Sequence, residues 1–157
     1  MRISFDVDDT LVCYQPGVAC EPCRVPWYLK PWYKEPLRKG ALALMTQLIK
    51  DGWDVGIYTT SYRETYYLKR FLKVYGIHLS FAINQRMHEE IAQAEGRSGF
   101  PSKFPRLFGI ALHVDDSEGV ALEGKAHNFS VVVVRPEDEQ WAEKVLQAAD
   151  QIRKSRC

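Results

Sequence analysis

The segment ISFDVDDTL, residues 3–11, is the most informative part of this chain for its fold. It begins with a short, mostly apolar run, as in a buried strand of a parallel sheet, and carboxylates follow directly. If side chains keep alternating at the strand end, Asp6 and Asp8 point the same way. Two such carboxylates repel each other unless a cation neutralises them, and Mg²⁺ prefers oxygen ligands. The alternative is a solvated acidic turn in which Asp9 or Thr10 caps a helix.

Further apolar runs predict four more strands, at residues 54–59, 81–84, 111–114 and 131–134. Helical spacing of apolar residues predicts helices at residues 41–48 and 68–75, and Pro136 with the acids after it predicts the start of a last helix. Residues 14–36 and 96–105 are interpreted as irregular. Strands that alternate with helices indicate a parallel sheet covered on both faces, with ligands beyond the carboxyl ends of its strands.

Polar side chains follow two other predicted strands. Asp115 and Asp116 form a second acidic strand end, and Thr59 and Thr60 end a strand in hydroxyls. Hydroxyls can donate to phosphate oxygens without adding charge. One acidic strand end is weak evidence for a site, but two of them with a hydroxyl end between them in sequence favour a site for a metal and a phosphate.

These ordered motifs resemble those of the haloacid dehalogenase superfamily of phosphohydrolases. The first family motif, Asp-x-Asp-x-Thr/Val-Leu/Val, is matched by residues 6–11, and the second, a Thr or Ser that ends an apolar strand, by Thr59. The third is a lysine upstream of the fourth strand, and the fourth is an acidic strand end, matched by Asp115 and Asp116. The resemblance covers about residues 1–135. It implies a Rossmannoid three-layer α/β sandwich whose five-stranded parallel sheet has the order 5-4-1-2-3.

The resemblance also implies a role for each matched residue. Asp6 would attack phosphorus, and Asp8 would protonate the leaving group and then activate water. Asp6, the backbone carbonyl of Asp8, and Asp116 would bind Mg²⁺, with Asp115 sharing that role or supporting it. The hydroxyl residues Thr59 and Thr60 would hold the phosphoryl oxygens together with a lysine.

Lys103 lies just before the fourth strand, where the family has its lysine, whereas Lys125 comes after that strand and fits poorly. Neither position for the large cap domains of the family holds enough chain for a second core, since the insert at residues 13–36 is too short. We therefore expect one domain over residues 1–157, with a small flap and an open site.

The insert contains two features with open interpretations. Cys13, Cys20 and Cys23 could be unliganded thiols, zinc ligands or a redox pair, and zinc would need a distant fourth ligand such as Cys157. Four aromatic residues could pack the insert or stack on a substrate: Trp27, Tyr28, Trp32 and Tyr33. The four histidines are expected to be ordinary surface or strand-edge residues.

The net charge of +1 gives no global attraction to nucleic acid or membranes, and a hydrophobic fraction of 46% is typical of a globular protein. With no signal-like or membrane-length segment, a cytoplasmic location is expected.

The prediction is a Mg²⁺-dependent phosphatase acting on a small phosphorylated molecule or a macromolecular end. The alternatives are a phosphotransferase, a receiver-like signalling domain, disfavoured because Asp6 follows the first strand, and a noncatalytic binding module.

Overall fold

A computed structural model of the protein describes residues 1–94 and 100–155. In this part of the chain, five parallel strands form one sheet in the order β3-β2-β1-β4-β5. This confirms the strand order expected from the sequence. The strands are β1 (Arg2–Phe5), β2 (Asp54–Tyr58), β3 (Phe81–Ile83), β4 (Ile110–Asp115) and β5 (Val131–Val133).

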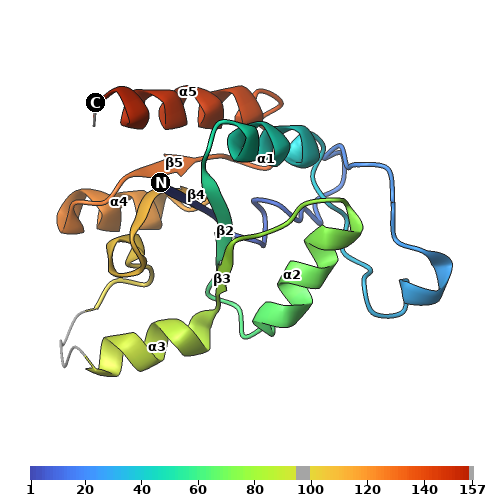
Figure 1. Cartoon of the computed structure of the whole chain (residues 1–157), viewed down its shortest axis with the longest axis horizontal. Coiled ribbons are helices and arrows are strands. Elements are labelled where there is room, and N and C mark those ends of the chain that lie inside the picture. The colour runs from blue at the N-terminus through green and yellow to red at the C-terminus, as the bar shows by residue number, and fades with distance from the viewer. Residues whose placement is uncertain (95–99, 156–157) are drawn as a thin grey trace.

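Helices cover both faces of the sheet (Figure 1). One face packs against α1 (Ala41–Lys50), α2 (Thr65–Val74) and α5 (Trp141–Lys154), and the other lies beside α3 (Gln85–Ala94) and α4 (Glu118–His127). Two short 3₁₀ helices, η1 (Trp27–Leu29) and η2 (Pro105–Phe108), lie in the connections. Helices on both faces bury both sides of a parallel sheet, which explains its short apolar strands.

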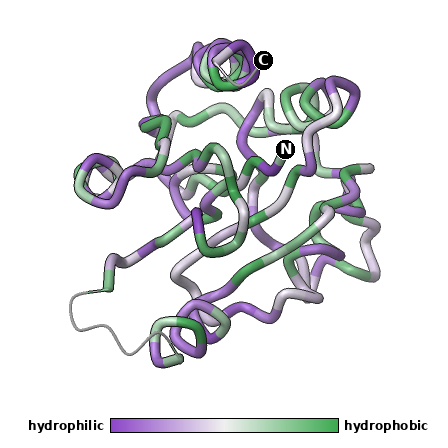
Figure 2. The backbone as a smooth tube through the Cα atoms, turned by 60° about the vertical axis from the view of Figure 1, so that its left-hand side comes forward, coloured by the Kyte–Doolittle hydropathy of each residue, from purple (hydrophilic) through white to green (hydrophobic). Residues whose placement is uncertain are grey.

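Alternation along β1 assigns its side chains to two cores. Ile3 and Phe5 are fully buried in the main core with residues of α1, α2 and α5. Ser4 faces the other side, where Tyr58, Ile83 and Ile110 form a smaller cluster. In Figure 2, α5, beside the C label, alternates between hydrophilic and hydrophobic residues, as expected for a helix that buries one face.

The last helix begins at Trp141, not at Pro136 as the sequence pattern predicted. The buried side chain of Arg38 explains the difference. Its Nη2 donates to the backbone carbonyls of Arg135, Pro136 and Asp138 at 2.6, 3.1 and 2.9 Å. Carbonyls bound to this guanidinium hold residues 135–138 in a turn, and the helix starts after it.

The helices α3 and α4 were not predicted from the sequence. Neither has a continuous apolar stripe, because α3 buries only His88 and α4 buries only Val120 and Gly124. Gly124 lets α4 approach the chain before β5, since a Cβ there would lie 2.8 Å from the Phe129 carbonyl oxygen.

The insert leaves the sheet directly after the first motif and extends outward from the molecule (Figure 1). Apart from η1 and isolated bridges it has no regular structure, as expected. Val25 and Tyr33 anchor it in the main core. The predicted loop at residues 96–105 lies in part, at 96–99, outside the described residues, as does Cys157. In the described chain, the helices are too short or too polar to cross a membrane.

Candidate active site

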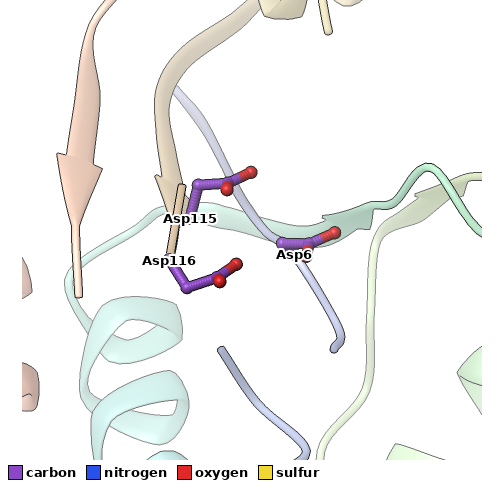
Figure 3. A group of neighbouring side chains, drawn as sticks. All are labelled: Asp6, Asp115 and Asp116. Carbon is purple, nitrogen blue, oxygen red and sulfur yellow. The ribbon is translucent and has the colours of Figure 1, made fainter. Parts of the chain in front are cut away.

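Three carboxylates meet at the carboxyl edge of the sheet. Asp6 directly follows β1, Asp115 ends β4 and Asp116 follows it, and one oxygen of each lies within 4.8 Å of the others. Figure 3 shows the three side chains extending to the same side of the two strand ends. The Asp6 backbone N–H donates to the Val114 carbonyl at 2.8 Å, which holds the two strand ends together. The predicted proximity of the two acidic strand ends is therefore confirmed.

Lys103 compensates two of these carboxylates. Its Nζ lies 2.8 Å from Asp6 Oδ1 and 2.5 Å from Asp115 Oδ2, and its side chain is 3% exposed. The bond to Asp115 is a well-aligned hydrogen bond, whereas Asp6 Oδ1 has close charge compensation but no aligned hydrogen-bond partner among the described residues. We regard the Asp6 contact as an ion pair, because the distance is short and the alignment is poor. The structure thus brings Lys103 to the candidate nucleophile, as the sequence predicted.

Asp115 is held more firmly than Asp116. Its Oδ2 accepts from Lys103 and, at 2.9 Å, interacts with His113 Nε2, and its Oδ1 accepts from the Ser117 backbone N–H at 2.9 Å. On the far side of the ring, His113 Nδ1 lies 2.8 Å from Ser4 Oγ. If His113 donates from Nε2, Ser4 donates to Nδ1, which fixes the ring orientation. Since both Asp115 oxygens are engaged, Asp116 is the better candidate for a metal ligand.

The three carboxyl groups also differ in the direction of their pKa shifts. Burial raises the pKa of Asp6; Lys103 opposes this shift and the charge of Asp115 adds to it. Burial, followed by the charge of Asp115, also raises the pKa of Asp116. Burial alone would raise the pKa of Asp115, but the hydrogen bond with His113 and the charge of Lys103 hold that pKa below its usual range. Asp6 and Asp116 therefore hold a proton more tightly than an ordinary carboxyl group does, whereas Asp115 holds one less tightly.

This donor set fits a hard divalent cation. The three carboxylates supply only oxygen ligands, which Mg²⁺ prefers, and crowding and burial favour a cation that would stabilise their ionised forms. No other group of three such ligands occurs in residues 1–94 and 100–155. Asp6 and Asp116 are the residues best placed to share an ion.

The end of β2, which is followed by the hydroxyl residues Thr59 and Thr60, lies beside this site. Thr59 follows β2, which is adjacent to β1, and is 1% exposed. Its Oγ1 accepts from the Ser61 backbone N–H at 3.2 Å and keeps its own proton to donate. Thr60 is exposed and lines an open hollow of about 420 Å³ together with residues of α3 and of the loop before Lys103. A larger hollow of about 610 Å³ includes none of the three carboxylates in its lining.

Asp8 does not join the carboxylate group, which corrects the expectation that Asp6 and Asp8 point the same way. The strand ends at Phe5, and the chain then forms a turn in which Asp9 has φ 56° and Leu11 N–H donates to the Val7 carbonyl at 3.0 Å. Strand alternation therefore stops before Asp8. The alternative interpretation, in which Asp9 or Thr10 caps a helix, does not hold either, because no helix begins at these residues.

The Asp8 side chain instead binds Arg63, in the connection between β2 and α2. Arg63 Nη1 and Nη2 donate to the two Asp8 oxygens at 2.7 and 2.8 Å. The same guanidinium donates from Nε to Glu35 Oε1, at the end of the insert, at 3.0 Å. The hydrogen bond with Asp8 raises the pKa of Arg63 above its usual range, and Glu35 adds to this shift.

The four aromatic residues of the insert separate into two groups. Trp27, Tyr28 and Trp32 are exposed, at 82%, 57% and 66%. Tyr33 is 7% exposed and stacks on Tyr67 at a centroid distance of 5.1 Å, so its ring is a packing element and not a substrate platform.

The described cysteines of the insert form no disulfide. Cys13 is buried, which raises the pKa of its thiol to about 11, while Cys20 and Cys23 are exposed. These three thiols do not come together as a group of metal ligands in residues 1–94 and 100–155, and Cys157 lies outside the described residues.

Sequence reasoning missed the buried histidines. His113 is fully buried and His88 is 5% exposed, so neither is a surface residue. The signal for His113 was its position two residues before Asp115 on one strand, which places both side chains on the same face. Its partner Ser4 is paired with it in register across β1 and β4. Glu35 carried no recognisable signal, because only folding brings it to Arg63.

A search against protein-family models finds no match for this chain, and a search of curated proteins finds no relative.

Proposed function

We propose that this protein is a Mg²⁺-dependent phosphatase of the haloacid dehalogenase type, with Asp6 as covalent nucleophile. One observation carries the proposal: Asp6 lies at the carboxyl edge of a parallel sheet, within ligand distance of Asp115 and Asp116 and 2.8 Å from Lys103. A nucleophilic carboxylate beside a buried lysine and further acids is suited to phosphoryl transfer, which depends mainly on positioning and charge compensation.

In the first step, an Asp6 oxygen bonds to phosphorus while the bond from phosphorus to the leaving oxygen breaks. Asp8 supplies the proton that the leaving oxygen takes up. Lys103 compensates the negative charge of the phosphoryl oxygens, and the Thr59 and Thr60 hydroxyls donate hydrogen bonds to these oxygens. A metal held by Asp6 and Asp116 would supply further positive charge against these oxygens.

In the second step, water attacks the aspartyl-phosphate and gives its proton to Asp8. The bond between Asp6 and phosphorus breaks, inorganic phosphate leaves, and both carboxyl groups return to their starting states. Lys103 keeps its position throughout, since Asp115 anchors it independently of Asp6.

The test is Asp6→Asn, measured as Mg²⁺-dependent hydrolysis of a generic aryl phosphate. We expect a loss on the order of a thousandfold or more in kcat, with an unchanged fold, because an amide is a poor nucleophile. Asp9→Asn is the matched control: Asp9 belongs to the same motif but lies outside the carboxylate group, and Asn tolerates its positive φ. It should keep most of the activity.

Fluoroberyllate, which mimics an aspartyl-phosphate, should bind only when Asp6 and Mg²⁺ are both present. Near-normal turnover by purified Asp6→Asn would show that the covalent mechanism is wrong.

A further inference from the structure

Arg63 connects the candidate acid/base residue to the insert. Its guanidinium binds both oxygens of Asp8 at 2.7 and 2.8 Å, and its Nη2 lies 2.9 Å from Glu35 Oε1. The Arg63 backbone is fixed as well, because its carbonyl accepts from Asn84 Nδ2 at 3.1 Å. One cation therefore faces two carboxylates at the edge of the site.

The two carboxylates are not held equally. The Glu35 side chain is 13% exposed and also accepts from the Tyr67 and Tyr14 hydroxyls at 2.7 and 3.2 Å. The Asp8 side chain is 43% exposed, and in the described chain its side-chain hydrogen bonds come from Arg63 alone. Asp8 therefore has fewer contacts to lose on leaving the guanidinium, and Glu35 would still hold Arg63.

The contact between Asp8 and Arg63 conflicts with the proposed role of Asp8. Proton transfer to a leaving oxygen needs an Asp8 oxygen within hydrogen-bond distance of it, whereas both oxygens are engaged by the guanidinium. A two-pronged bond between Arg and a carboxylate is among the stronger side-chain interactions, so its loss needs compensation. Another oxyanion on the same guanidinium edge supplies that compensation.

We propose that Arg63 is a specificity-determining residue, which binds a second anionic group on the leaving portion of the substrate and thereby releases Asp8 for acid/base work. The inference rests on the proposed phosphatase function. The planar edge formed by Nη1 and Nη2 fits a carboxylate or a phosphate. The substrate class is therefore a phosphomonoester that carries a further carboxylate or phosphate near the scissile bond.

The test compares carboxyphenyl phosphates, with the carboxylate ortho, meta or para, with their neutral carbamoyl counterparts. We expect wild type to prefer the carboxylate form in at least one position by about 10–100-fold in kcat/KM. A preference of this size is typical of one charge-assisted hydrogen bond, here between Arg63 and the carboxylate of the substrate. Arg63→Gln should bring that ratio close to one, and Arg63→Lys, which keeps the charge but loses the fork, should give an intermediate ratio. Phenylene bisphosphates show whether a phosphate replaces the carboxylate.

Arg86→Gln is the matched control, since it removes one positive charge from an exposed pair with Glu64 and should keep the wild-type ratio. Equal kcat/KM for both forms in wild type at every position, or an unchanged ratio in Arg63→Gln, overturns the inference.

Calorimetric binding of carboxybenzylphosphonate and its carbamoyl analogue repeats the comparison without turnover. Failure of the proposed function appears separately, as an absence of hydrolysis or of Asp6 dependence, while the binding ratio still tests Arg63.

Discussion

Lys103 stabilises a buried concentration of negative charge that would otherwise oppose folding. Its ammonium group contacts both Asp6 and Asp115. Because all three side chains are buried, the charged form of the lysine and those of the two carboxylates stabilise one another. Burial lowers the pKa of Lys103, but the two carboxylates outweigh it and raise that pKa overall. Removing one member of such a cluster leaves buried charges without compensation.

We predict that Lys103→Met lowers the free energy of unfolding by about 3–5 kcal/mol in the presence of a chelator. Mg²⁺ should raise the melting temperature of this variant more than that of wild type, because the ion compensates the carboxylates that Lys103 has left. Thermal melts with and without Mg²⁺ measure both effects.

Lys125→Met, at an exposed position on α4, is the control and should melt like wild type. If Lys103→Met also melts like wild type in the chelator, the buried ion pairs do not stabilise the fold.

At the scale of elements, β2 and α3 together position the loop that carries Lys103. Tyr58, the last residue of β2, has its hydroxyl 2.5 Å from His88 Nδ1 on α3, and the same oxygen accepts from the Phe104 backbone N–H at 2.9 Å. Phe104 directly follows Lys103, so these two bonds link the lysine backbone to the sheet. The small cluster under β2 and β4 is therefore part of the support for the site.

This link predicts a pH dependence of stability. Burial lowers the pKa of His88, although hydrogen bonding with the Pro101 backbone opposes the shift. The unfolded state therefore binds a proton more readily than the folded state, and the stabilisation is complete above the unfolded pKa of about 6.5 and is lost as pH falls below it. We expect the melting temperature of wild type to fall between about pH 7 and pH 5.

His88→Gln retains an amide that can hydrogen-bond but does not titrate, so its melting temperature should fall less steeply over that range. His113, whose pKa is also lowered by burial, stays in both proteins, and the difference between the two curves isolates His88. Parallel curves would show that His88 does not titrate on unfolding.

Over the whole molecule, the insert combines an anchored side and an exposed side. Tyr33 stacks against Tyr67 and Phe71 of α2, at centroid distances of 5.1 and 6.3 Å, whereas Trp27 and Trp32 are exposed to solvent. Large exposed aromatic rings contribute little to folding and are suited to contacts with a ligand. Tyr33 therefore positions the insert, and of the two interpretations given to its aromatic residues, stacking on a substrate applies only to the exposed rings.

We predict that Tyr33→Ala lowers the free energy of unfolding by about 3–5 kcal/mol, as expected for loss of a buried ring. Trp27→Ala and Trp32→Ala should each change it by less than about 0.5 kcal/mol, because exposed side chains leave no cavity. Urea unfolding of the three variants measures the difference. Comparable losses at all three positions would mean that the exposed rings also pack.

The strand order and the meeting of the two acidic strand ends were predictable from sequence. Apolar runs that end in carboxylates locate β1 and β4, and the ordered motifs placed these strands side by side. Lys103 was expected from the family resemblance, which implies a lysine before the fourth strand. These features depend on short-range patterns and on the rule that parallel strands present their carboxyl ends at one edge.

The sequence by itself determined a parallel α/β sheet with Asp6, Thr59 and Asp116 at its carboxyl edge, because each of these residues directly follows a strand. The tertiary structure brings Lys103, which precedes β4, to the same edge, where the contacts of Tyr58 with His88 and Phe104 hold its loop. Only the tertiary structure decided the orientation of Asp8, whose turn ends strand alternation and directs it to Arg63. It also decided the engagement of Asp115 by His113 and the late start of α5 at Trp141. These features depend on contacts between residues far apart in the chain, and no local pattern of side chains encodes such contacts.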